Sequence, residues 1–335
     1  GMHGNELAVM SALILGIKDD LNDELKLDYS RSGAMHILAV SGMHVAVIYM
    51  VLNLFLSQLF RSQKFRIPKN LIIILFLWFY AFITGMSASV LRATVMFTFV
   101  ATGFALDRKS IMYNTISLSA LVILMFYPNH ILDPGLQLSY AAVIGIVYFQ
   151  PGILKWFSPR NKILRMAWEM TAVTLSAQIA TLPVTLFYFN QFPNYFLLSN
   201  FLAVPLSTGI IYLAIVLLVI SPFTWLAGVL GWISQLAVHL LNGLMGWVHH
   251  LPGSVSLVYV SLPEMVLMYV ALIFLMFYLV RKGYISLLMS LLAVFVISLS
   301  GLFRIYSNIQ EAQLVLFSDK KNIIEYFAIV LLSVF

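Results

Sequence analysis

Ten long apolar segments, separated by short polar loops, constrain the fold of this chain more than any other feature. A helix needs about 20 apolar residues to cross the hydrocarbon core of a membrane, and continuous apolar runs exclude a transmembrane β-barrel, whose strands alternate. With 61% hydrophobic and 10% charged residues, the chain has too little polar surface for a soluble protein. The sequence therefore predicts an all-α polytopic membrane protein with about ten transmembrane or re-entrant helices. The segments are 33–60, 67–84, 85–106, 111–127, 135–150, 167–190, 195–220, 224–250, 263–280 and 284–302.

This pattern divides the chain into three predicted regions. Residues 1–32 are expected to form a flanking helix and an acidic extracytoplasmic segment, and residues 33–303 the transmembrane domain. Residues 304–335 are expected to open a truncated extracytoplasmic soluble domain, because two strand-like stretches give this short tail a β-like character. The segments at 135–150 and 224–250 are the least regular, so a re-entrant or interfacial position stays open for both.

Basic residues distinguish the two sets of alternating loops. Twelve of the 19 Lys and Arg residues lie in one set, whereas the opposite loops at 128–134, 191–194 and 251–262 hold none. Because cytoplasmic loops of membrane proteins carry an excess of Lys and Arg, the first set is predicted to be cytoplasmic and both ends of the chain extracytoplasmic. The twelve residues are Arg61, Lys64, Arg66, Lys69, Arg108, Lys109, Lys155, Arg160, Lys162, Arg165, Arg281 and Lys282.

The first apolar segment carries polar side chains that a helix would place on one side. At about 100° per residue, His36, Ser41 and His44 fall within an arc of about 140°, next to Gly42, which allows close helix approach. A hydrogen-bonded packing patch, a Ser–His catalytic pair and the wall of a hydrated path all stay open. The segment offers no orienting carboxylate for catalysis and no further ligand for a metal ion.

Arg92 is the only lysine or arginine in a predicted membrane interior. On a helix it shares a stripe with Ser89 and Met96, which lie three residues before it and four residues after it. An arginine in the membrane interior costs several kcal/mol unless it faces a cavity or a partner. The pattern therefore indicates a hydrated path or an anionic substrate beside Arg92.

A second polar stripe lies in the segment at 167–190. Thr174, Gln178 and Thr181 recur at helical spacing, and Pro183 follows them. Threonine can also bond to its own helix, so this stripe has a purely structural alternative. Because proline removes a backbone donor, Pro183 is expected to break the helix and to leave carbonyl groups that line a cavity.

Two further blocks combine polar residues with proline. Asp133 followed by Pro134 is typical of a helix cap and first turn, and Gln137 is expected to face the interior of the helix that follows. In the segment at 195–220, Asn200 and Pro205 again indicate a polar, interrupted helix. Interrupted helices at membrane depth are typical of transport proteins. The residues alone therefore indicate a channel or transporter, with an intramembrane hydrolase as the lesser alternative.

These same segments resemble the competence domain of the ComEC family, the inner-membrane DNA channel of natural transformation. The matching blocks follow the order of the family and lie within roughly residues 5–300. They are His36–Val45, Leu91–Ala93, Asp133–Ala142, Gln178–Pro183 and Leu198–Pro205. The resemblance implies a bacterial inner-membrane protein that passes single-stranded DNA into the cytoplasm, with the polar residues named above lining the path.

The resemblance also implies partners. Besides the lipid bilayer and single-stranded DNA, these are extracytoplasmic DNA-receptor components and a cytosolic ATPase, since this sequence contains no nucleotide-binding loop. No cofactor is expected, and the chain contains no cysteine. Many family members carry a metallo-β-lactamase-like domain, but no histidine follows residue 303, so we do not expect this chain to be an enzyme. A small-solute or lipid-precursor transporter, or a rhomboid-like protease with Ser41 as nucleophile, remains the alternative.

Overall fold

The structure is a computed structural model that describes residues 4–108 and 111–310. The chain divides after Tyr259 into two compact units. Within the described residues, nine helices are long and apolar enough to cross a membrane, which confirms the predicted all-α polytopic class. They are α3 (Gly42–Leu59), α4 (Arg66–Ile83), α5 (Ala88–Ala105), α7 (Pro134–Leu154), α8 (Lys162–Phe189), α9 (Phe196–Ile220), α10 (Thr224–His249), α11 (Leu262–Arg281) and residues 284–304 of α12 (Tyr284–Gln310).

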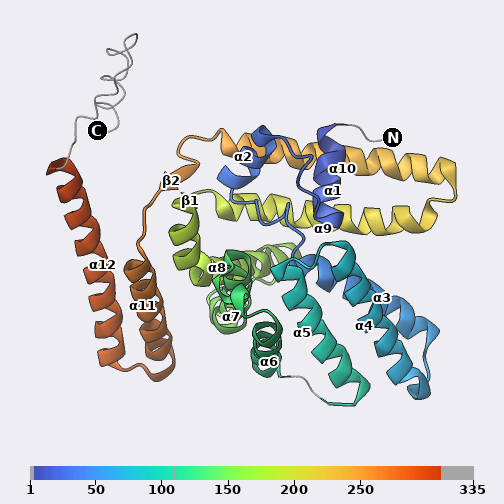
Figure 1. The fold of residues 1–335 in the computed structure, drawn as a ribbon, viewed down its shortest axis with the longest axis horizontal. Helices are drawn as coiled ribbons and strands as arrows, with labels where there is room; N and C mark the ends of the chain where they lie inside the picture. The colour runs from blue at the N-terminus through green and yellow to red at the C-terminus, as the bar shows by residue number, and fades with distance from the viewer. Residues whose placement is uncertain (1–3, 109–110, 311–335) are drawn as a thin grey trace, which may run out of the picture. The chain divides into compact units, whose positions relative to one another are not determined.

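The remaining helices are short (Figure 1). They are α1 (Asn5–Leu15), α2 (Asp23–Arg31), α6 (Met112–Phe126) and the 3₁₀ turns η1 (Gln63–Phe65) and η2 (Pro128–Leu132). The segment predicted at 135–150 forms a longer helix of 21 residues, and the one at 224–250 forms a helix of 26 residues. The short helix is instead α6, with 15 residues. The strand-like stretches predicted at 312–317 and 322–327 lie outside the described residues.

The first span begins nine residues later than the apolar run predicts. α3 starts at Gly42, and Ser41 is its N-cap with an extended backbone conformation. The preceding loop is apolar because Ile37 and Leu38 are buried in a core between helices. The prediction that His36, Ser41 and His44 share one arc of a helix was therefore wrong. Apolar residues indicate burial, whether in a helix or in a loop, whereas the start of a helix depends on a local cap.

Neither predicted helix break is present. Pro183 lies inside α8, and Pro205 lies inside α9, and both helices continue past them. Proline inside a membrane helix is tolerated because neighbouring helices and hydroxyl side chains can satisfy the carbonyl groups that it leaves. Pro183 leaves the carbonyl group of Ile179 without its backbone donor, and the hydroxyl of Thr181 donates one turn earlier, to the carbonyl oxygen of Ala177 at 2.9 Å.

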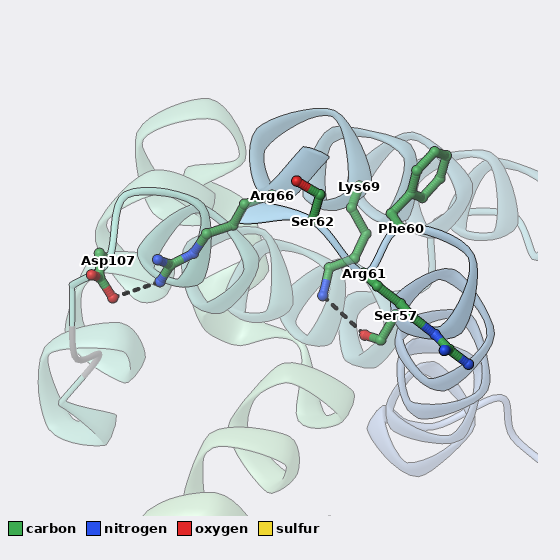
Figure 2. A pocket seen from close by; sticks show the side chains of 7 residues that line it. All are labelled: Ser57, Phe60, Arg61, Ser62, Arg66, Lys69 and Asp107. Atoms are coloured by element: carbon green, nitrogen blue, oxygen red, sulfur yellow. Dashed lines mark hydrogen bonds and ion pairs between the residues drawn. The ribbon is translucent and has the colours of Figure 1, made fainter. Parts of the chain in front are cut away.

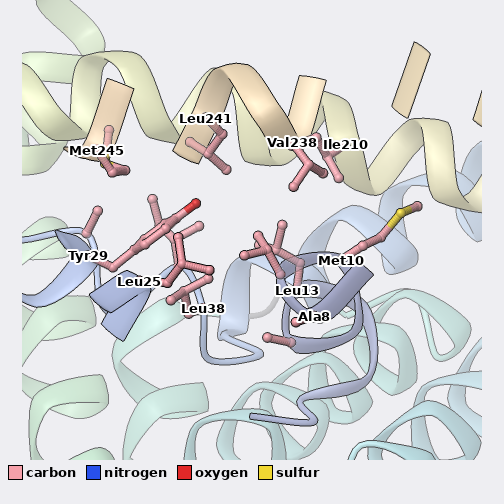
Figure 3. Close-up of a cluster of buried hydrophobic side chains, with 14 of the residues drawn as sticks. Ala8, Met10, Leu13, Leu25, Tyr29, Leu38, Ile210, Val238, Leu241 and Met245 are labelled. Carbon is pink, nitrogen blue, oxygen red and sulfur yellow. The ribbon is translucent and has the colours of Figure 1, made fainter. Parts of the chain in front are cut away.

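The first unit contains a large apolar core in which helices from the start of the unit pack against α9 and α10, near its end in sequence. α1, α2 and the loop before α3 pack against α9 and α10, and Figure 3 shows their side chains facing those of the two long helices. Polar pairs lie at the edges of this core. Tyr29 donates to Asn242 at 2.8 Å, Glu6 lies 3.0 Å from His239, and Asp28 lies 2.6 Å from His249. α1 and α2 are thus held against α10, which lies more than 200 positions away in the sequence.

The other helices of this unit form two packed groups. α4 and α5 pack together and against α3, and their shared core contains Ile73, Leu77 and Val90. α7 and α8 approach so closely that a methyl group on Gly145 would lie 2.5 Å from the carbonyl oxygen of Ser176 and 2.5 Å from Cβ of Ala180. Glycine is therefore required at this crossing.

A short ladder joins two loops that are both predicted to be extracytoplasmic. β1 (Gln191–Pro193) pairs antiparallel with β2 (Val255–Leu257), with Phe192 opposite Ser256. In the second unit, α11 and α12 form a helical hairpin. There Glu264 accepts hydrogen bonds from Ser300, at 2.7 Å, and from Arg304.

Candidate functional site

Arg92 lies near the N-terminal end of α5 and is buried, with 5% of its surface exposed. It is the fifth residue of that helix, which places it about 6 Å from the helix start. The guanidinium lies over the ring of Tyr140 in α7, with Cζ 5.7 Å from the ring centroid, and Nη1 lies 3.9 Å from the sulfur of Met96. Arg92 is therefore near one end of its helix and not at the middle of it.

Gly42 provides the space that the guanidinium occupies. A methyl group on Gly42 would lie 2.7 Å from Nη2 of Arg92. Gly42 is also the first residue of α3, where the helix dipole is positive. The positively charged side chain of Arg92 therefore lies next to the N-terminus of α3, which carries a partial positive charge.

Ser41 and His44 form a capping box at this helix start. The Ser41 hydroxyl accepts from the amide of Met43 at 3.3 Å and lies 3.0 Å from Nδ1 of His44. The Ser41 amide also donates to Nδ1, at 3.1 Å, so this nitrogen carries the lone pair and the ring proton lies on Nε2. The Ser–His contact is therefore explained by helix capping.

Hydroxyl groups extend this cluster onto two more helices. The hydroxyl of Tyr140 lies 2.9 Å from that of Ser119 in α6, and Ser89 in α5 lies 3.1 Å from Ser139 in α7. Ser41, Gly42, His44, Arg92 and Tyr140 are together called the Arg92 cluster below. The sequence indicated Gln137 in this block and missed Tyr140, although Tyr140 lies one helical turn further along α7.

The Arg92 cluster carries a positive charge that its surroundings do not balance. In the described parts of the chain, no carboxylate forms an ion pair with Arg92. Among the same residues, Nε of Arg92 and Nε2 of His44 are buried without a hydrogen-bond partner. Burying a cation and two donors in this way is costly. The arrangement is suited to an anion that approaches between α3 and α5.

The other predicted residues of the α7 block have local roles. Asp133 is the N-cap of α7, where its carboxylate accepts from the amide of Gly135 at 2.7 Å, and Pro134 occupies the first turn. The predicted cap is thus confirmed. Gln137 is half-buried, and its amide donates to the carbonyl oxygen of Ile131 at 2.8 Å, which ties η2 to α7.

The four polar residues predicted for a path on α8 and α9 are half-buried. Thr174, Gln178 and Thr181 lie on α8, where the hydroxyl of Thr181 bonds to its own helix, as the structural alternative expects. Asn200 lies on α9, and its Oδ1 is buried with no hydrogen-bond partner among the described residues. His36 lies in the loop before α3 and is exposed. A role of these residues in a path stays a prediction.

The described helices of membrane-spanning length, with a buried cation between them, define the class of the protein, which is a polytopic helical membrane protein. The competence protein family model matches residues 13–282, and the chain belongs to this family. It is 28% identical over 244 residues to ComE operon protein 3 of Bacillus subtilis (strain 168), which covers 70% of this chain and 30% of that protein. It is also 26% identical over 215 residues to the uncharacterized protein YcaI of Escherichia coli (strain K12), covering 61% and 28%.

The chain therefore spans less than a third of the length of either curated relative. No solved structure matches it.

Proposed function

We propose that this chain forms the part of an inner-membrane conduit through which single-stranded DNA enters the cytoplasm during natural transformation. Membership of the competence protein family supports a role in DNA uptake. The observation that carries the more specific proposal is the Arg92 cluster, where a buried cation at the start of two spans has no acidic partner among the described residues. A phosphodiester, with one negative charge per nucleotide, supplies the missing charge.

The affinity for DNA that we expect of the Arg92 cluster is low enough for a strand to pass through without being held. A conduit must attract its substrate and also release it. Many basic contacts would hold a DNA strand, because each neutralised phosphate adds to affinity. One arginine, with the hydroxyl groups of Tyr140 and Ser119 nearby, binds a single phosphate and lets the strand advance.

The proposal places other functions outside this chain. The sequence has no nucleotide-binding loop, so a cytosolic ATPase supplies the energy, and extracytoplasmic receptor proteins deliver the strand. The orientation that agrees with the basic loops puts the start of α3 and α5 on the extracytoplasmic side. The Arg92 cluster then lies near the entrance of the conduit.

Replacing Arg92 in a naturally transformable host tests this function. Arg92→Met keeps most of the side-chain volume and removes the charge, so we expect transformation to fall about tenfold to a hundredfold, the range of one charge-assisted hydrogen bond. Fluorescent DNA is expected to accumulate outside the inner membrane. Arg92→Lys keeps the charge and is expected to retain part of the activity. Arg108→Met, which removes an exposed cation from a loop, is the matched control. Normal transformation by Arg92→Met at wild-type abundance would contradict the proposal.

Ser41→Asn separates the conduit from a hydrolase with Ser41 as nucleophile. Asparagine caps helices as well as serine does but has no hydroxyl nucleophile. A conduit should keep most of its transformation activity in this variant, measured beside wild type at equal abundance. A hydrolase should lose all of its activity in this variant. In addition, the wild-type chain should react with a fluorophosphonate if it is a hydrolase and should not react if it is a conduit.

A further inference from the structure

A basic pocket lies at the opposite end of α3 and α5 from the Arg92 cluster. It forms where α3 ends, α4 begins and α5 ends, and its volume is about 570 Å³. Figure 2 shows the side chains that line it, which come from three helix ends. They are Ser57, Phe60, Arg61, Ser62, Arg66, Lys69 and Asp107.

Arg66 has partners within the protein. Its Nη2 donates to the carboxylate of Asp107 at 2.7 Å, and its Nε donates to the carbonyl oxygen of Phe104 at 2.5 Å. The same hydrogen bond from Arg66 lowers the pKa of Asp107 below its usual value. This pair closes one side of the pocket and is balanced in charge.

The other two cations of the pocket have no acidic partner among the described residues. Nζ of Lys69 donates to Asn53 at 3.1 Å and to Ser57 at 3.0 Å, which leaves its third donor and its charge unmatched. Arg61 is exposed, and no hydrogen bond or ion pair of its side chain is found in the described ranges. The pocket therefore has an excess of two positive charges.

Apolar side chains surround this charged pocket. Leu59, Ile67 and Leu106 lie next to it in sequence, one at each of the three helix ends, and they are exposed by 64%, 62% and 63%. Helix ends of membrane-spanning length lie at the level of the lipid headgroups. A ligand with an anionic head and acyl chains meets both surfaces, whereas a nucleic acid strand meets only the charged one.

We propose that this pocket binds the phosphate headgroup of an anionic phospholipid. Arg61 and Lys69 hold the phosphate, the Ser62 hydroxyl donates to it, and the acyl chains lie against the exposed apolar residues beside the pocket. The balanced pair of Arg66 and Asp107 shapes the site without binding the ligand. The proposal does not depend on the conduit function, because bound lipid would serve any membrane protein of this fold.

Titration of the purified full chain in neutral detergent, followed by native mass spectrometry, tests this site. The probes are short-chain phosphatidylglycerol, short-chain phosphatidylcholine and inorganic phosphate. We expect phosphatidylglycerol to bind more tightly than either of the others, since phosphatidylcholine has no net charge and inorganic phosphate has no acyl chains. Arg61→Gln and Lys69→Gln are each expected to weaken phosphatidylglycerol binding about fivefold, and the double variant about thirtyfold.

Arg160→Gln is the matched control, because Arg160 is an exposed cation in another basic loop and is expected to leave binding unchanged. The Arg61 side chain makes no hydrogen bond or ion pair with any described residue, so Arg61→Gln tests the site even if Lys69→Gln proves unstable. Equal affinity for both lipids, or an unchanged affinity in Arg61→Gln, overturns the proposal. So does inorganic phosphate binding as tightly as the lipid, which indicates a free-phosphate site. Displacement of the lipid by a short single-stranded oligonucleotide would overturn it in favour of a DNA contact.

Discussion

Gly42 and Arg92 share one small space, which makes Gly42 informative at the scale of a single residue. In Gly42→Ala the new methyl group would lie 2.7 Å from Nη2 of Arg92, closer than these atoms can stay. Since Nη2 is the far end of a flexible side chain, we expect the guanidinium to move and the fold to persist. The variant should reach wild-type abundance in membranes, while transformation falls about tenfold or more.

Gly209→Ala is a suitable control for this variant. Gly209 lies inside α9, and a methyl group there would meet nothing within 4 Å, so the change is expected to be neutral or slightly stabilising. A Gly42→Ala protein that transforms as well as Gly209→Ala would show that the position of the Arg92 guanidinium does not matter.

At the scale of the helix pair, the contact of α7 with α8 depends on Gly145. Gly145→Leu would place a bulky side chain where the carbonyl oxygen of Ser176 and the Cβ of Ala180 already lie. Backbone cannot move aside as a side chain does, so we expect a loss of stability of about 1–3 kcal/mol, measured by unfolding in detergent. Gly152→Leu, on the same helix with open space around it, should lose much less. Equal losses in both would show that helix propensity, and not packing, explains the effect.

The docking of α1 on α10 should depend on pH. The hydrogen bond with His239 lowers the pKa of Glu6 below its usual 4.5. A carboxyl group with a lowered pKa stabilises the folded state above its unfolded pKa, and this contribution is lost as the pH falls through the folded value. The protection factors of the α1 amides, which correct hydrogen exchange for its intrinsic pH dependence, should therefore decrease below about pH 4.5. In Glu6→Gln the exchange of α1 should be faster at neutral pH and lack this pH-dependent step; an unchanged step would assign it to another group.

Sequence patterns located the long helices and most of their starts, but not the start of α3 and not the contacts between helices. The apolar runs gave all the long helices, and the Asp133–Pro134 pair gave the start of α7, because a cap is a local feature. The start of α3 was missed because Ile37 and Leu38, which extend the apolar run, lie in a buried loop and not in the helix. The contact of Tyr140 with Arg92 joins residues 48 positions apart, and no local pattern encodes such a contact. Of the proposed site, the sequence indicated the polar residues, and the structure brings Ser41, Gly42, His44 and Arg92 together.

At the scale of the whole chain, the alternating loops predict an orientation that labelling can test. The chain has no cysteine, so single cysteines can be placed at the exposed residues Ser62, Ser158 and Asn129. An impermeant maleimide added outside the inner membrane should label only the cysteine at position 129, because the basic loops around 62 and 158 are predicted to be cytoplasmic. Permeabilised cells provide the control for reactivity at all three positions. Labelling at 62 or 158 in intact cells would reverse the orientation, and with it the entrance and exit of the proposed conduit.

The three-residue ladder between β1 and β2 limits how the first unit can move. It ties the chain just before α9 to the chain just after α10, so these two helices form a loop fastened at its base. A movement that drew α9 away from α10 would have to break backbone hydrogen bonds, whereas a movement of both helices together would leave the ladder intact. We therefore expect α9 and α10 to move together as one rigid pair. α1 and α2 pack against this pair, so such a movement would have to carry them along or break their contacts with it.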